Sequence, residues 1–131
     1  VYVLFLDDRN CPVKMQKVTE GTVNEAAMAR TQIARLAVQC HATQAVLAHN
    51  HPAGAALPSP SDIQFTRELA NALASLGIRF LDHIIVDKEG DYISLQQSGR
   101  MPAVEPTLMQ GVAGSKEKAL EQGKKENHGS V

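Results

Sequence analysis

The sequence of 131 residues contains no tryptophan, few aromatic residues and only two cysteines. Because aromatic residues make up 4% of the chain and apolar residues 44%, its core must be built mainly from aliphatic side chains. The cysteines, Cys11 and Cys40, have neither metal-binding nor redox spacing, which argues against a disulfide framework and a cysteine zinc site. We therefore expect a reduced, cytoplasmic protein.

The sequence also lacks an excess of charge of one sign, since it contains 13 lysines and arginines and 14 aspartates and glutamates. A net charge of -1 provides no basic stripe, so charge does not support nucleic acid as a partner. The chain contains no apolar run long enough to cross a membrane and no recognisable signal peptide. Its length predicts one domain that is large enough to bury a core.

Signals for strands and helices alternate along the chain. Apolar runs predict strands at 1–6, 11–22, 45–48, 78–86 and 92–95, and helical spacing of apolar residues predicts helices over 28–40 and 60–76. The first two strands should form a hairpin. Because the strand at 45–48 is apolar on both faces, we expect it to be central in the sheet. The predicted fold class is α/β, a mixed sheet with helices packed on its faces.

The most informative stretch begins where the strand at 45–48 ends. His49 and His51 follow it directly, and side chains two apart on a strand share a face, so both imidazoles can converge on one ion. Asp62, at the start of the second predicted helix, is a suitable third ligand. Two imidazoles and one carboxylate leave one position of a tetrahedral zinc ion open for water, as in catalytic sites.

The same residues also have a purely structural interpretation. Ser59, Pro60 and Asp62 make an ordinary helix start with a serine N-cap, and two histidines at a strand end can simply face solvent. The matching distance between the two parts favours the metal site. Ser59 can serve both purposes, because a hydroxyl at a helix N-terminus can also stabilise developing negative charge.

Asp82 and His83 interrupt an otherwise apolar predicted strand, and polar groups in a buried strand need partners. One interpretation is a pair that orients a metal ligand. The other, which we favour, is a core histidine bonded to Asp82 or to the backbone.

The pattern His-x-His, seven residues, then Ser-x-x-Asp resembles the JAMM motif of JAB/MPN metalloprotease domains. It is met here by His49, His51, Ser59 and Asp62. The flanking segments HNHPAG, PSPSDIQFTREL and LGIRFLDHIIV are similar to the RadC-like branch of that family. The resemblance implies a cytidine-deaminase-like JAB/MPN fold over residues 1–99. It also implies zinc as the cofactor, with Ser59 as a catalytic residue. The deaminase signature itself is absent, since neither cysteine has a partner two residues away.

This resemblance implies hydrolysis of peptide or isopeptide bonds by metal-activated water, and therefore a protein or peptide substrate. The glutamate that acts as base in the family precedes the first strand, which would place it upstream of Val1. We therefore expect the domain to be truncated at its N-terminus. Glu20 and Glu25 are the candidates inside the chain, but neither lies in a recognisable motif.

Two other functions remain open at this point. The chain can be a non-catalytic JAB/MPN module that contacts protein partners, or a metal-dependent phosphodiester hydrolase, because histidine and aspartate ligands suit that chemistry too. After Gly99 the composition changes: prolines appear without a period, and the end of the chain is almost wholly polar. Residues 100–131 are therefore predicted to be a flexible or disordered tail.

Overall fold

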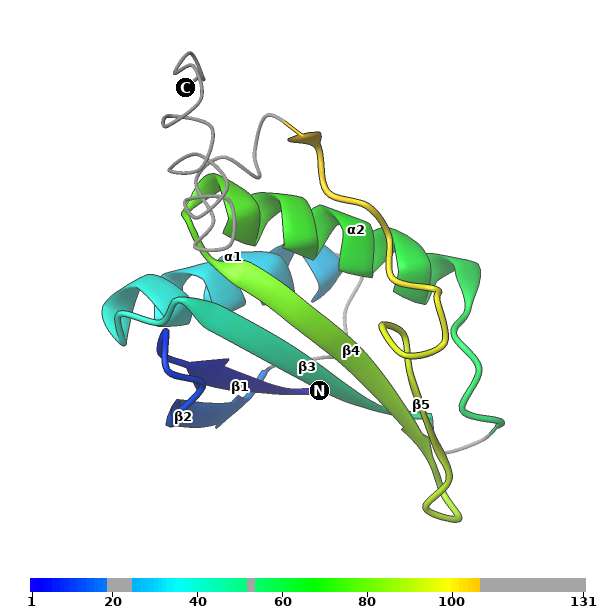
Figure 1. The fold of residues 1–131 in the computed structure, drawn as a ribbon. Coiled ribbons are helices and arrows are strands. Elements are labelled where there is room, and N and C mark those ends of the chain that lie inside the picture. Colours follow the sequence, from blue (N-terminus) through cyan, green and yellow to red (C-terminus); the bar gives the residue numbers. More distant parts are fainter. Residues whose placement is uncertain (19–24, 52–53, 107–131) are drawn as a thin grey trace.

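The computed structural model describes residues 1–18, 25–51 and 54–106, which form a mixed sheet of five strands and two helices (Figure 1). The strands are β1 (Tyr2–Leu6), β2 (Pro12–Lys17), β3 (Gln44–His51), β4 (Arg79–Asp87) and β5 (Tyr92–Ser94). The helices are α1 (Glu25–Gln39) and α2 (Pro60–Ser75). In the sheet order β2-β1-β3-β4-β5, only β3 and β4 are parallel neighbours. The predicted α/β class with a mixed sheet is confirmed, and β3 is central as expected.

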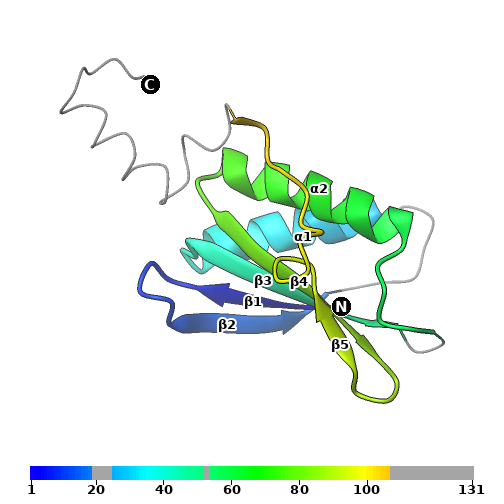
Figure 2. The ribbon, with the colours of Figure 1, turned by 45° about the vertical axis from the view of Figure 1, so that its right-hand side comes forward.

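Both helices pack against the same face of the sheet (Figures 1 and 2). On that face Val3 and Phe5 of β1 and Leu47 of β3 are almost completely buried, because alternate side chains of a strand share one side. The helices cover them with aliphatic side chains, chiefly Ile33, Ala37, Leu69 and Leu73. Leu4 and Val46 point the other way and are only half-buried. The described part of the chain is therefore two-layered, with an aliphatic core.

The first two strands form the predicted hairpin, although β2 ends at Lys17 and residues 19–24 lie outside the described part. In the turn, Asp7 Oδ1 accepts hydrogen bonds from the backbone N–H groups of Arg9 and Cys11, both at 2.9 Å. Asn10 adopts a left-handed conformation there, with a φ of 65°. Asparagine tolerates this conformation better than most residues, so the turn matches its sequence.

A β-bulge lies between β3 and β4. Ala45 pairs with Phe80 whereas Val46 pairs with Asp82, so Leu81 is the extra residue. Phe80 packs against the core beneath the helices, and His83 bonds to α2. Asp82 instead bonds to Ser94 and to the backbone after β5. The bulge therefore decides which polar side chain of β4 faces α2.

After β5 the chain turns and returns across α2 (Figures 1 and 2). We call residues 100–106 the return segment. Its first N–H, of Arg100, donates to the Leu95 carbonyl at 2.8 Å, and the N–H of Glu105 donates to Asn71 Oδ1 at 3.0 Å. Chain packing thus continues past Gly99, and the rest of the predicted tail, 107–131, lies outside the described residues.

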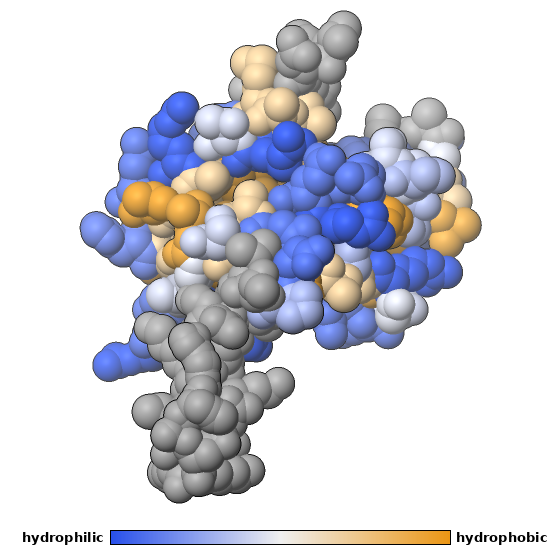
Figure 3. All heavy atoms as spheres, turned by 90° about the horizontal axis from the view of Figure 1, so that it is seen from above, coloured by the Kyte–Doolittle hydropathy of each residue, from blue (hydrophilic) through white to orange (hydrophobic). Residues whose placement is uncertain are grey.

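The surface above α2 is mainly hydrophilic, and apolar atoms appear there in separate small areas (Figure 3). This agrees with the amphipathic pattern of α2, whose buried residues recur on one side of the helix. Neither described helix is long and apolar enough to cross a membrane.

Candidate metal centre

The end of β3 and the first turn of α2 bring two histidines and one aspartate together. His49 and His51 continue the side of β3 that carries Leu47 and lie beside the first turn of α2, where their side chains are 26% and 20% exposed. His49 Nδ1 lies 3.5 Å from Asp62 Oδ1, and His51 Nε2 lies 3.0 Å from Asp62 Oδ2. One ligand atom from each residue falls within 4.8 Å of the other two. The structure thus brings together the three residues that the sequence pattern selected.

These separations suit a zinc ion. With bonds of about 2.0–2.1 Å, the ligand atoms of a tetrahedral zinc are about 3.3 Å apart. The two histidine–aspartate separations, 3.5 Å to Asp62 Oδ1 and 3.0 Å to Asp62 Oδ2, lie on either side of that value. Two imidazoles and a carboxylate also form the donor set of a zinc site with an open position. The residues present therefore fit the metal.

Asp62 is held in place by a capping box at the start of α2. The Asp62 N–H donates to Ser59 Oγ at 3.1 Å, and the Ser59 N–H donates to Asp62 Oδ2 at 2.8 Å. Pro60 occupies the first helical turn, where its missing N–H costs nothing. The helix start and the ligand proposed from sequence are therefore the same structure, since the box that begins α2 also orients the carboxylate.

The environment keeps Asp62 ionised. Burial by itself raises the pKa of this carboxyl group. The hydrogen bonds from Ser59 and the charges of His49 and His51 outweigh burial, so the pKa lies below its ordinary value. A carboxylate that stays charged near neutral pH is what a metal ligand requires.

His51 is oriented by the loop that follows β3. Its Nδ1 lies 3.3 Å from the carbonyl oxygen of Ala55, which can only accept a hydrogen bond. Nδ1 therefore donates to this carbonyl, and Nε2 is the ring nitrogen that lies on the side of Asp62, 3.0 Å from Oδ2. Such a contact from the non-ligating nitrogen commonly fixes the tautomer of a metal-binding histidine.

One turn below Asp62, Thr66 connects α2 to β4. The Thr66 hydroxyl donates to the Asp62 carbonyl at 2.7 Å, and its oxygen lies 2.6 Å from His83 Nδ1. Because the hydroxyl proton is already used, Nδ1 must be the donor. The His83 ring stacks on that of His49, with centroids 5.9 Å apart. Thr66 was not predicted from the sequence, although its position four residues after Asp62 on a buried helix face was a usable signal.

His83 is 1% exposed, and burial lowers its pKa to about 4. Its Nε2 is buried without a hydrogen-bond partner among the described residues. The ring bonds to Thr66, not to Asp82 or the backbone as we favoured from sequence. Asp82 accepts from Ser94 Oγ and from the Gln96 N–H, and so stabilises the turn after β5. The two adjacent side chains therefore contact different elements, and the His83 backbone N–H also donates to Asp82 Oδ1 at 2.7 Å.

Neither glutamate considered from sequence is placed at the cluster. Glu20 lies outside the described residues, and Glu25 is the first residue of α1, with an undescribed side chain. In the described part of the chain, no glutamate joins His49, His51 and Asp62.

A protein-family model described as the RadC-like JAB domain matches residues 1–100. A UPF0758 protein of Actinobacillus pleuropneumoniae is 43% identical over 95 residues, covering 72% of this chain and 43% of the relative. UPF0758 proteins of Photobacterium profundum and Vibrio atlanticus are 42% and 41% identical over 98 residues, covering 75% of this chain and 43% of each relative. The chain therefore spans less than half the length of these relatives.

Proposed function

The chain belongs to the RadC-like JAB domain family, and we propose that it is a zinc-dependent hydrolase of peptide or isopeptide bonds. The proposal rests on one observation, the convergence of His49, His51 and Asp62 at distances that suit zinc with an open position. The family assignment supports a JAB domain, and the geometry supports metal-assisted hydrolysis as its chemistry.

A zinc ion held by these residues would polarise a substrate carbonyl and lower the pKa of water to about 7. The protein residues around it have complementary roles. Asp62 supplies fixed negative charge, and the contact to Ala55 keeps His51 in the ligating tautomer. The stacking of His49 on the buried His83 restricts rotation of the His49 ring.

Ser59 is the residue we propose to stabilise the oxyanion. Its oxygen accepts the Asp62 N–H and lies 3.1 Å from Ser61 Oγ. When Ser61 is the donor in this contact, the Ser59 hydroxyl proton is available to a negative oxygen. The positive end of the α2 dipole favours negative charge at the same place. Such a donor typically contributes about 3 kcal/mol to lowering the barrier.

The general base is the one catalytic group of the proposed reaction that has not yet been assigned to a residue. A positioned acid/base contributes about 100- to 10,000-fold in rate, and no described glutamate joins the cluster. We propose that the base comes from a part of the protein outside residues 1–131. Residues 1–131 alone should then bind zinc but hydrolyse peptide bonds slowly.

The test compares residues 1–131 with the full-length protein on internally quenched peptides and on an isopeptide-linked substrate. Zinc-dependent cleavage by the longer protein, lost on Asp62→Asn, is the expected result. If the longer protein binds zinc at this site yet cleaves neither substrate, the hydrolase proposal is wrong. The lack of a glutamate among the described residues near the cluster would then favour the second candidate, a non-catalytic module that contacts protein partners.

A further inference from the structure

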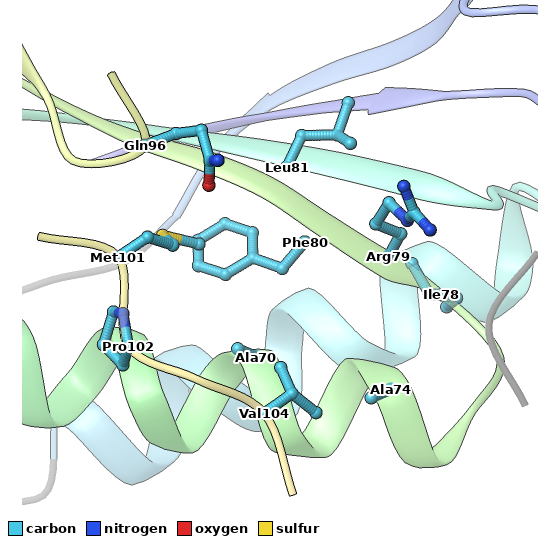
Figure 4. Close-up of a pocket in the computed structure, with 10 residues that line it drawn as sticks. All are labelled: Ala70, Ala74, Ile78, Arg79, Phe80, Leu81, Gln96, Met101, Pro102 and Val104. Carbon is cyan, nitrogen blue, oxygen red and sulfur yellow. The ribbon is translucent and has the colours of Figure 1, made fainter. Parts of the chain in front are cut away.

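A cavity of about 470 Å³ lies at the other end of α2, away from Asp62 (Figure 4). It is open to solvent on one side and is lined by the second half of α2, the beginning of β4, Gln96 and the return segment. The lining is mostly apolar and includes Ala70, Ala74, Phe80, Met101 and Val104. Its volume falls within the range of ligand-binding pockets, about 300–1,000 Å³.

One wall of this cavity is an open sheet edge. β5 pairs only with Ile84–Val86 of β4, and one further bond joins the Leu95 N–H to the His83 carbonyl. Among the described residues, no strand pairs with Arg79–Leu81 on the β5 side of β4. An open edge of this kind can accept an additional strand through backbone hydrogen bonds.

Successive side chains along this edge of β4 point to opposite faces of the sheet. Figure 4 shows Phe80 pointing from β4 toward α2, while Arg79 and Leu81 leave the strand on the opposite side. The side chains of Arg79 and Gln96 make no hydrogen bond or ion pair with another described residue. In a strand added at this edge, every second side chain would face the apolar cavity on the Phe80 side. The side chains between them would lie beside the unpaired guanidinium of Arg79.

We propose that Arg79–Leu81 of β4 binds an extended peptide segment whose side chains alternate between apolar and acidic. The apolar side chains enter the cavity between Phe80 and Val104, and an acidic side chain pairs with Arg79. The cavity supplies apolar burial, the edge supplies backbone hydrogen bonds, and Arg79 supplies the charge preference. This site is separate from the proposed metal centre and does not depend on its function.

The test uses fluorescence anisotropy with a labelled heptapeptide of alternating glutamate and valine. Its controls are a lysine–valine heptapeptide and an N-methylated form of the first peptide that cannot pair as a strand. In the wild-type protein the glutamate peptide should bind about fivefold more tightly than the lysine peptide, as expected for one solvent-exposed ion pair. The N-methylated peptide should bind at least about tenfold more weakly than its parent.

The charge swap Arg79→Glu should reverse the preference between the two peptides, whereas the matched swap Arg9→Glu in the β1–β2 turn should leave it unchanged. Val104→Trp fills the cavity from the half-exposed return segment and should weaken both peptides. His49→Ala should have no effect on binding, which separates this site from the metal centre.

Amide shifts in a ¹⁵N spectrum should locate the bound peptide at Phe80, Gln96 and Met101. The proposal is wrong if Arg79→Glu leaves the preference unchanged, or if N-methylation has no effect. It is equally wrong if the shifts appear at the end of β3, or if neither peptide binds at millimolar concentration. Self-association that Val104→Trp abolishes would show that a second copy, not a peptide, occupies this edge.

Discussion

Two groups of side chains in the described part of the chain have the ligand types and spacing to hold a metal ion. One consists of His49, His51 and Asp62, and the other of Asp87, Glu89 and Asp91 in the turn between β4 and β5. We call them the histidine cluster and the acidic turn. The first joins two elements that are eight residues apart in sequence, whereas the second lies within five consecutive residues. The first is half-buried, and the second is mostly exposed.

The comparison shows that proximity of ligand atoms does not by itself define a metal site. Asp87 Oδ1 already accepts the N–H groups of Glu89 and Asp91, at 2.9 and 3.0 Å, so its carboxylate stabilises the turn. In the histidine cluster, hydrogen bonds from residues outside the cluster orient Asp62 and His51. The Ser59 N–H holds Asp62, and the Ala55 carbonyl holds His51. We therefore propose metal binding at the histidine cluster and not at the acidic turn.

The largest expected difference between the two clusters is in stabilisation by zinc. A ligand present at 100 times its Kd stabilises the native state by about 2.7 kcal/mol, which corresponds to a rise in Tm of roughly 8 °C for a domain of this size. His51→Ala should abolish the rise, and Asp91→Asn should retain it. Differential scanning fluorimetry with and without zinc measures both. Loss of the rise in Asp91→Asn alone would reverse the assignment.

The helix cap beside the histidine cluster should affect chemistry as well as stability. Ser59→Ala removes the N-cap, which costs about 1 kcal/mol in the free energy of unfolding. It also removes the proposed oxyanion donor, which should lower the turnover of the full-length protein by about 100-fold or more. Urea unfolding and steady-state kinetics separate the two effects. Unchanged turnover together with reduced stability would leave Ser59 only its capping function.

The contact between Thr66 and His83 should affect zinc affinity to a smaller degree. Thr66→Val keeps the shape of the side chain but removes the hydroxyl that joins Asp62 to His83. Outer contacts of this kind commonly change metal affinity by about tenfold or more. Thr66→Ser retains the hydroxyl and should restore the affinity. Competition titrations with a zinc chelator measure this, and equal affinity in Thr66→Val and wild type would show that the contact is only structural.

The acidic turn should show the smallest effect. Asp87→Ala removes two hydrogen bonds from an exposed turn and should cost about 1 kcal/mol or less in stability. Zinc affinity, measured by the same chelator competition, should not change. Reduced affinity in this variant would mean that the acidic turn contributes to zinc binding.

The residues of the histidine cluster could be identified from sequence because each signal is local. Alternation along a strand places His49 and His51 on one face, and a serine with an aspartate three residues later begins a helix. That the histidine pair and the helix start belong to one site was predicted from the resemblance to a known motif. Local rules do not determine the distance between the end of β3 and the start of α2.

Other features depend on contacts between distant segments. The partner of His83 is set by the bulge at Leu81, and no feature of the sequence around this residue indicates an extra residue there. The placement of both helices on one face of the sheet depends on which side of the sheet the segments between strands and helices cross. Packing of the return segment on α2 was also missed, because its prolines and lack of periodicity are typical of a tail.

Anomalous diffraction from crystals soaked in zinc tests the central claim most directly, because it locates the metal without reference to activity. Data collected on both sides of the zinc absorption edge identify the element. We predict one strong peak bounded by His49 Nδ1, His51 Nε2 and the Asp62 carboxylate. A zinc peak at Asp87, Glu89 and Asp91 with none at the histidines would contradict the account.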